Sequence, residues 1–262
     1  MLRRVVVYLE KGGVGKTMTS IHLADGLARM GKKVTLIDLD PQGQCTVRLG
    51  LVNKEKPKIR LSEVIRSGWP EGMSNKERFK NLVMYARPNL FLIPGSRDLT
   101  PIQFQLASTG DWEGSLQRAL GFFEDSAMDY VIMDTNPSWT PLSAIALFWG
   151  TELVFPVETS SSAAYSISHF QDELVKVQER KEGELEVVYI LPTRKKNTRE
   201  SEGIVEDLKT AYPDKFCEPI RERTAMAECG GHGETIWEYQ PNDDSAEDYM
   251  NFVKKVMSRE VR

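Results

Sequence analysis

The residues from Glu10 to Ser20 read EKGGVGKTMTS, and their types suit the binding of a polyphosphate. Gly15, Lys16 and Thr17 complete the second half of the P-loop pattern G-x-x-x-x-G-K-[ST], in which the lysine contacts the outer phosphates and the hydroxyl contacts Mg2+. Backbone N–H groups of such a glycine-rich turn point at one centre, and the helix that follows adds its partial positive charge. The loop therefore predicts a site for a nucleoside triphosphate.

The loop departs from the pattern at its start. Glu10 stands where the pattern has its first glycine, and an additional lysine, Lys11, follows it. This second ammonium group at the mouth of the loop raises the question of which phosphate it would reach.

Three acids follow apolar runs farther along the chain. Asp38 and Asp40 come after residues 34–37 in VTLIDLDPQGQ, and Asp134 comes after residues 130–133 in DYVIMDTNPS. Carboxylates this close together are costly unless a cation lies nearby, and Asp134 fits the Walker-B pattern of an acid that holds Mg2+. Each acid alone is equally consistent with an ordinary turn. Together with the loop, they predict a Mg2+ site formed by Thr17, Asp40 and Asp134.

Short apolar, β-branched runs recur along the chain, and most are separated by segments with helical periodicity. The runs are Val5–Leu9, Val34–Ile37, Leu90–Ile93, Tyr130–Met133, Leu153–Val157 and Val187–Leu191. This alternation predicts an α/β fold with a mostly parallel, twisted sheet flanked by helices on both faces. Because ligands of such sheets bind at the carboxyl ends of the strands, the glycine loop, Asp38 and Asp134 are expected to converge.

The 262 residues are expected to form a single domain over 1–262. Residues 52–88 are charged and broken by Pro57 and Gly68-Trp69-Pro70, so we expect a helical excursion on the rim of that domain. With 40% hydrophobic and 27% charged residues, the composition excludes disordered and fibrous classes. A net charge of -4 gives no global attraction to nucleic acid or anionic lipid, so such a partner requires a local basic patch.

The three cysteines have no C-x-x-C spacing, which suits a reducing compartment and speaks against an iron–sulfur reductase. Only five apolar residues precede Glu10, too few for a signal peptide, and no apolar stretch reaches the ~18 residues of a membrane span. We therefore expect a cytoplasmic protein.

The motifs KGGVGKT, DLDPQGQ and VIMDTNPS together resemble those of the deviant Walker-A ATPases of the ParA/Soj and MinD group. Further similarity lies in LIPGS at 92–96, VFPVE at 154–158 and ECGGHGETIWEYQPNDDSAEDY at 228–249, so the resemblance covers essentially the whole chain. It implies a P-loop NTPase fold of ParA/MinD type that binds ATP with Mg2+ and hydrolyses it slowly without a partner.

The resemblance also implies roles for individual residues. Lys11 would reach across a two-fold dimer to the phosphates of the partner's ATP, as an arginine finger does. Asp40 would position the attacking water, and Asp38 would support the magnesium shell. The catalytic residues implied are Lys11, Lys16 and Asp40, and the nucleotide contacts are Lys11, Gly12, Gly13, Val14, Gly15, Lys16, Thr17, Met18, Thr193 and Arg194.

A basic stretch, TRKKNTRE at 193–200, follows the last apolar run. Thr193 and Arg194 resemble positions beside the adenine. By resemblance the candidates for contact with DNA phosphates are Lys195, Lys196, Arg199, Arg221 and Arg223, although a basic stretch of this kind is equally often a solvated loop. Two positions depart from the family: Asn136 replaces a second proline after Asp134, and Ala225 stands where DNA-binding relatives often have arginine.

The sequence thus predicts an ATP-dependent dimerising switch that coats nucleoid DNA without sequence preference and positions cargo. A centromere-binding protein or another cargo-bound adaptor would stimulate hydrolysis, and the cargo is open among a plasmid, a chromosome and a protein compartment. The main alternative is a MinD-like ATPase at the membrane. The closing stretch MNFVKKVMSREVR places Phe252, Val253 and Met257 on one helical face, which we expect to dock on the core rather than on lipid. A metabolic P-loop enzyme would require a second-substrate pocket, and no motif outside the ATP site indicates one.

Overall fold

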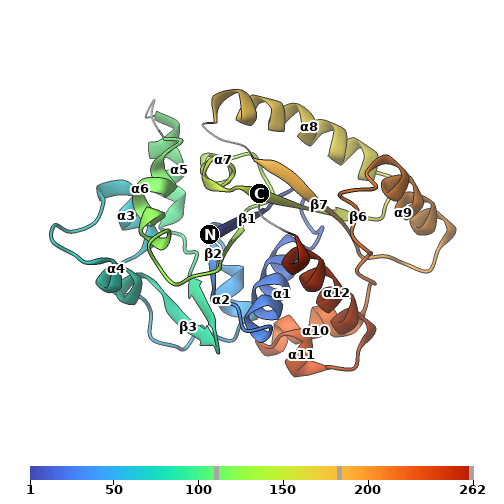
Figure 1. Ribbon diagram of the computed structural model, residues 1–262, viewed down its shortest axis with the longest axis horizontal. Helices are drawn as coiled ribbons and strands as arrows, with labels where there is room; N and C mark the ends of the chain where they lie inside the picture. The colour runs from blue at the N-terminus through green and yellow to red at the C-terminus, as the bar shows by residue number, and fades with distance from the viewer. Residues whose placement is uncertain (109–111, 182–184, 260–262) are drawn as a thin grey trace.

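The computed structural model describes residues 1–108, 112–181 and 185–259. Over these residues one seven-stranded sheet has the order β3-β4-β2-β5-β1-β6-β7 (Figure 1). The strands are β1 Arg3–Val7, β2 Val34–Asp38, β3 Met84–Arg87, β4 Leu90–Ile93, β5 Tyr130–Asp134, β6 Glu152–Glu158 and β7 Glu186–Thr193. All neighbouring strands are parallel except β3 and β4. The predicted fold class is therefore confirmed.

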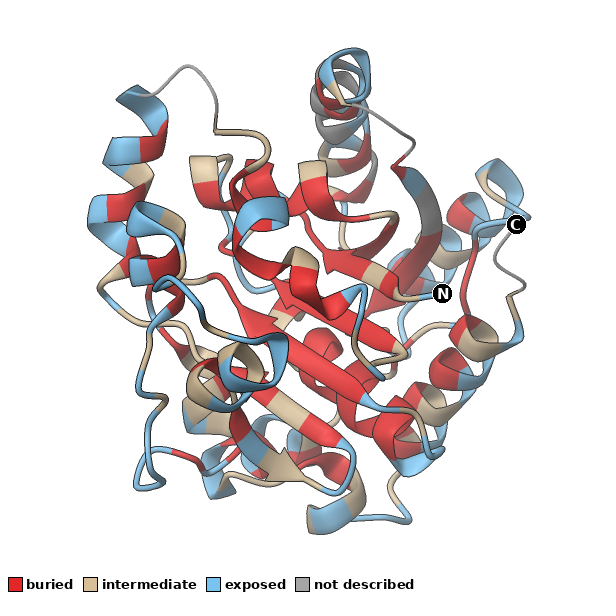
Figure 2. Cartoon of the chain, turned by 60° about the vertical axis from the view of Figure 1, so that its left-hand side comes forward, coloured by how far each residue is buried: buried red, intermediate tan, exposed pale blue. Residues whose placement is uncertain are grey.

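Helices cover both faces of the sheet, and most of its strands are buried (Figure 2). Alternate side chains of the central strands contribute to two apolar cores. In β1, for example, Val6 belongs to one core, whereas Val5 and Val7 belong to the other. The first core includes side chains of α3 Leu61–Ser67, α5 Leu99–Ser108, α6 Ser115–Leu120, α7 Pro141–Trp149, α8 Ala163–Arg180 and α9 Arg199–Ala211. The second core includes side chains of α1 Lys16–Arg29, α2 Gln44–Arg48 and α12 Asp244–Ser258. Strands buried on both faces read as continuous apolar runs, which is why they were predictable.

The remaining helices lie at the edges of the fold. They are α4 Asn75–Leu82, α10 Thr224–His232 and α11 Ile236–Tyr239, and a short 3-10 turn spans Gly121–Phe123. Of these, α10 and α11 lie beside α1 and α12 in Figure 1. Leu82 of α4 and Phe123 of the 3-10 turn also belong to the first core.

The excursion at 52–88 is only partly helical. Helices α3 and α4 lie in it, but Met84–Arg87 is a strand, β3, which pairs antiparallel with β4 at the edge of the sheet. An edge strand needs only one apolar face: Met84 is buried, whereas Tyr85 is 63% exposed and packs edge-on against Phe91. The sequence analysis did not predict this strand, because its short apolar pattern lies within a charged segment.

The last helix docks on the core, as predicted. Phe252 and Val253 are buried, and α12 packs against α1. A Cβ atom on Gly26 of α1 would lie 2.5 Å from Cγ2 of Val253, so the glycine permits the close approach of the two helices. Within the described residues no helix is both long and apolar enough to span a bilayer.

A buried histidine connects α1 to the C-terminal helices. The backbone N–H of Ile236 donates to His22 Nε2 at 3.0 Å, so Nδ1 carries the proton and donates to the carbonyl of Met18 at 2.7 Å. The ring stacks on Tyr249 with centroids 4.7 Å apart. Burial lowers the pKa of His22 to about 4, because the interior disfavours the imidazolium.

We expect His22 to make the protein less stable in acid. The unfolded chain takes up a proton near pH 6.5 and the folded chain only near pH 4, so stability from this residue is complete above pH 6.5 and is lost as the pH falls toward 4. Between pH 7 and pH 5 the loss is on the order of 2 kcal/mol. Urea unfolding of wild type and His22→Phe at both pH values measures it. An equal pH dependence in the two proteins would contradict the prediction.

Candidate functional site

The three predicted strand ends meet at one edge of the sheet. The glycine loop follows β1, and Asp38 of β2 lies opposite Asp134 of β5 in the parallel register. Gly13 and Gly15 have φ of +78° and +89°, which residues with a Cβ rarely adopt, and no atom lies within 4 Å of where their Cβ atoms would be. The loop is thus an open turn that leads directly into α1, and the predicted convergence is confirmed.

Lys16 is folded into this loop. Its Nζ donates to the carbonyl oxygens of Leu9 at 2.9 Å and Lys11 at 2.6 Å, and only 7% of the residue is exposed. Burial lowers its pKa to about 8, opposed by the charges of Asp134 and Asp40. A buried ammonium group among carbonyl oxygens is suited to receive an anion.

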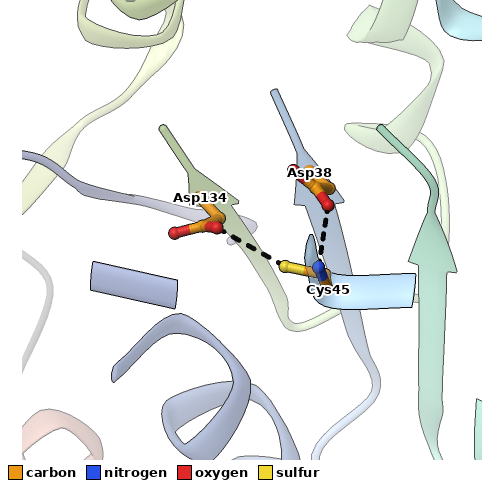
Figure 3. A group of neighbouring side chains, drawn as sticks. All are labelled: Asp38, Cys45 and Asp134. Carbon is orange, nitrogen blue, oxygen red and sulfur yellow. Dashed lines mark hydrogen bonds between the residues drawn. The ribbon is translucent and has the colours of Figure 1, made fainter. Parts of the chain in front are cut away.

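Two buried carboxylates flank a thiol behind the loop (Figure 3). Asp38 Oδ2 accepts from the backbone N–H of Cys45 at 2.9 Å, and the Cys45 thiol donates to Asp134 Oδ2 at 3.5 Å. Burial raises the pKa of Asp38 well above its usual value and that of Asp134 to about 6, and the Asp134 charge raises Asp38 further. Burial also raises the pKa of the Cys45 thiol, which is therefore protonated.

Hydroxyl groups of α1 hold Asp134. Ser20 Oγ donates to Asp134 Oδ1 at 2.8 Å, and a hydrogen bond from Thr17 also favours the ionised form of this carboxyl. Sequence reasoning missed Ser20, although its position one helical turn after Lys16 indicates that it faces the same site. Asp40 is half-buried at the mouth: its own N–H donates to Asp38 Oδ1 at 3.0 Å, and its Oδ1 accepts from Gln42 N–H at 2.9 Å.

This donor set fits a magnesium ion. Mg2+ prefers oxygen ligands, and Thr17, Asp40 and Asp134 offer a hydroxyl and two carboxylates at one edge of the sheet. Burial raises the pKa of Asp38 and Asp134 because it disfavours their ionised forms, and a divalent cation bound beside them would favour those forms again.

Lys11, the additional lysine, does not point into its own loop. Its Nζ lies 2.6 Å from Ser162 Oγ and 3.1 Å from Glu158 Oε2. Glu158 ends β6 and also lies 3.6 Å from Arg194 Nη1, so one carboxylate pairs with two cations predicted to bind nucleotide. The strand-end rule that selected Asp38 and Asp134 indicates Glu158 as well, but the sequence analysis assigned it no role.

The segment after β5 is tied to the loop. Glu10 Oε1 accepts from the backbone N–H of Trp139 at 3.3 Å, which gives the residue in place of the first glycine a structural partner. Asn136 Nδ2 donates to Oγ1 of Thr140, the N-cap of α7, at 3.1 Å. The segment that follows Asp134 is therefore anchored at both the loop and α7.

A cavity of about 270 Å³ adjoins the loop on the side of α10. It is lined by Gly15, Met18, Arg48, Thr193, Arg194, Ile220, Arg221, Glu222, Arg223, Met226, Ala227 and Tyr249. Thr193 Oγ1 donates to the carbonyl of Val14 at 2.8 Å, which attaches the end of β7 to the loop. Arg194 has a φ of +53°. The two residues predicted beside the adenine thus line a cavity next to the phosphate loop.

The structure brings the two predicted basic segments together but pairs part of their charge. The backbone N–H of Lys195 donates to the carbonyl of Ile220, so residues 195 and 221 lie side by side. Arg221 forms a bidentate pair with Asp248, and Arg223 pairs with Asp244. Both arginines therefore have acidic partners on α12, which weakens the charge argument for their contact with DNA. Ala225 is buried, where an arginine side chain would not fit without rearrangement.

Less of the charge on the other segment is paired. Lys196 lies 3.6 Å from Glu222 with 58% of its side chain exposed, and Lys195 Nζ contacts the uncharged amide oxygen of Asn197 at 3.5 Å. Arg199 is exposed at the start of α9.

Comparison with known proteins shows which family this chain resembles. Residues 2–187 match the family model described as an AAA domain. The chain is 31% identical to the chromosome-partitioning ATPase Soj of Thermus thermophilus, over 98% of this chain and 96% of that protein. Among solved structures it is similar to the ATP complex of a McdA variant from Cyanothece, with a TM-score of 0.80, 23% identity and coverage of 100% and 99%. It is also similar to the septum site-determining protein MinD of Pyrococcus horikoshii with Mg-ADP, with a TM-score of 0.77, 17% identity and coverage of 98% and 97%.

Proposed function

This chain belongs to the ParA/MinD superfamily of partition ATPases, and from that membership we propose that it is a switch that dimerises on ATP and holds cargo on DNA. As a member of the superfamily it is a positioning ATPase. The dimer, the DNA contact and the roles of individual residues are our proposals.

The nucleotide is ATP with Mg2+. In this proposal the N–H groups of the glycine loop and Lys16 bind the phosphates, while Thr17, Asp40 and Asp134 hold the metal. When bound, Mg2+ neutralises charge on the phosphate oxygens. Asp40 is half-buried at the mouth, which suits a residue that positions a water molecule at the last phosphate.

The observation that carries the dimer is the position of Lys11. Its ammonium group is turned away from its own loop and is held by Glu158 and Ser162, with 27% of the side chain exposed. A cation at this surface is available to the phosphates of a facing subunit. We propose that dimer formation exchanges the pair with Glu158 for a contact with the partner's ATP, which stabilises both the dimer and the charge that develops during hydrolysis.

The DNA contact rests on Lys195, Lys196 and Arg199, because Arg221 and Arg223 are paired with α12. A chain with a net charge of -4 and few unpaired cations binds DNA weakly as a monomer. A dimer doubles the contacts within one particle and strengthens binding through effective concentration. ATP thus controls DNA binding by controlling dimerisation, and a cargo-bound adaptor or centromere-binding protein would end it by stimulating hydrolysis on the nucleoid.

We expect binding to random duplex DNA only with ATP, and Lys195→Ala combined with Lys196→Ala to weaken it without changing ATP affinity. Each lost phosphate contact should reduce the slope of log affinity against log salt by roughly 0.9, because fewer counterions are released. Fluorescence anisotropy of labelled random duplexes over a salt series measures both affinity and slope.

The matched control is Lys54→Ala with Lys56→Ala, which removes the same charge from two exposed positions on the rim excursion. If this control weakens binding as much as the double substitution at 195 and 196, the effect is one of net charge and the proposed contact is wrong. If the ATP form binds anionic vesicles and no duplex at low salt, the MinD-like alternative replaces the proposal.

A further inference from the structure

Arg48, the last residue of α2, lines the cavity beside the glycine loop and has no role in the proposal above. It reaches that cavity because α2 contacts both α1 and α10. The half-buried Arg48 is therefore close to Met18, a predicted nucleotide contact.

The guanidinium of Arg48 lacks the partners that the neighbouring arginines have. Within the part of the chain that the structure describes, its Nε is buried with no hydrogen-bond partner, and its Nη1 contacts the weak acceptor Sδ of Met18 at 3.6 Å. Over the described residues no carboxylate lies within ion-pair distance of Arg48. By contrast, the other arginines of the cavity pair with acids: Arg194 with Glu158, Arg221 with Asp248 and Arg223 with Asp244. A buried N–H without a partner is costly, which indicates that a ligand supplies the acceptor.

The surrounding helix leaves room for this side chain. A Cβ atom on Gly230 of α10 would lie 2.7 Å from Arg48 Nη1 and 3.6 Å from Met18 Sδ. The glycine thus allows the guanidinium to rest between α10 and the first turn of α1. Its position is defined by packing, and it is not a freely solvated surface charge.

We infer that Arg48 binds the nucleoside part of the nucleotide, donating from its guanidinium to an acceptor of the base or ribose. This inference rests on the proposed ATP site. The triphosphate already has the loop N–H groups and Lys16 as donors. The cavity beyond the loop has apolar walls, among them Ile220 and Met226, beside its charged lining residues. Those walls suit a planar ring, and Arg48 supplies the polar group that orients it.

The test compares Mg-ATP with Mg-tripolyphosphate, which carries the phosphates without a nucleoside. Arg48→Met keeps much of the apolar stem and removes the donors. We expect its affinity for Mg-ATP to fall about tenfold or more. Its affinity for Mg-tripolyphosphate, calculated from competition with ATP, should equal that of wild type. Calorimetry measures ATP binding, and competition measures tripolyphosphate. Arg66→Met is the control, because Arg66 is an exposed arginine of α3 that does not line the cavity.

The outcomes separate this inference from the proposed function. If wild type binds no ATP, the proposed function fails. If wild type binds ATP and Arg48→Met binds it equally well, or loses ATP and tripolyphosphate alike, Arg48 does not bind the nucleoside. If Arg48→Met is shown by circular dichroism to be unfolded, Gly230→Ala decides: it retains the charge and displaces the guanidinium, and it should cause the same selective loss of ATP. Unchanged ATP affinity in that variant overturns the inference.

Discussion

Lys16→Ala is expected to weaken the binding of Mg-ATP by on the order of a hundredfold or more, because it removes the buried ammonium group that would pair with the phosphates. Lys16 Nζ is the buried cation of the loop, and it sits on the carbonyl oxygens of Leu9 and Lys11. When ATP binds, the phosphates would replace these carbonyls as partners. Without the ammonium group, only the backbone N–H groups of the loop and the bound Mg2+ would offset the charge of the phosphates, which lie close to the acids Asp38 and Asp134.

Calorimetric titration of Mg-ATP into wild type and Lys16→Ala measures the loss. Lys54→Ala, at an exposed position on the rim, removes the same charge far from the loop and should bind ATP as wild type does. Circular dichroism shows whether each variant is folded. Equal ATP affinity in folded wild type and Lys16→Ala would remove the P-loop interpretation of this site.

Asp40→Ala is expected to slow ATP hydrolysis by roughly a hundredfold or more, the contribution of a positioned acid–base group, while the ATP-dependent dimer remains. The substitution keeps the hydrogen bond from the backbone N–H of residue 40 to Asp38 Oδ1 and removes the one that Asp40 Oδ1 accepts from the N–H of Gln42. The half-buried carboxylate itself is lost, and with it the group proposed to position water. ATP should therefore accumulate uncleaved in a stable dimer.

Lys11→Ala is the contrasting variant. Its side chain contacts Glu158, Ser160 and Ser162, which lie outside the glycine loop. We expect it to retain ATP binding and to lose the dimer. Sedimentation velocity with Mg-ATP distinguishes the two variants, and phosphate release measures hydrolysis. A Lys11→Ala protein that dimerises normally would show that this lysine acts within its own subunit, and rapid hydrolysis by Asp40→Ala would exclude the role of Asp40.

The agreement between sequence and structure is closest where the pattern is local. Apolar runs bounded by turns predicted six strands, because a strand buried on both faces is apolar at nearly every position. The ends of two of these runs indicated that Asp38 and Asp134 lie at the edge of the sheet. The helix that follows the glycine loop was predictable for a similar reason. Met84–Arg87 was missed, since an edge strand with one exposed face carries a weaker pattern in a charged segment.

The sequence by itself determined the order of the site motifs along the chain: a glycine loop, then an acid pair, then a third acid. It also indicated that all three lie at the carboxyl edge of a parallel sheet. Only the tertiary structure decided which charges are paired. Lys11 meets Glu158 and Ser162, which are 147 and 151 residues away, and Arg221 meets Asp248 across 27 residues. Arg48 faces a cavity because Gly230, on a distant helix, leaves room for it. Local patterns follow from the backbone geometry of single elements, whereas ion pairs and cavities arise where separate elements pack, and no sequence spacing encodes that meeting.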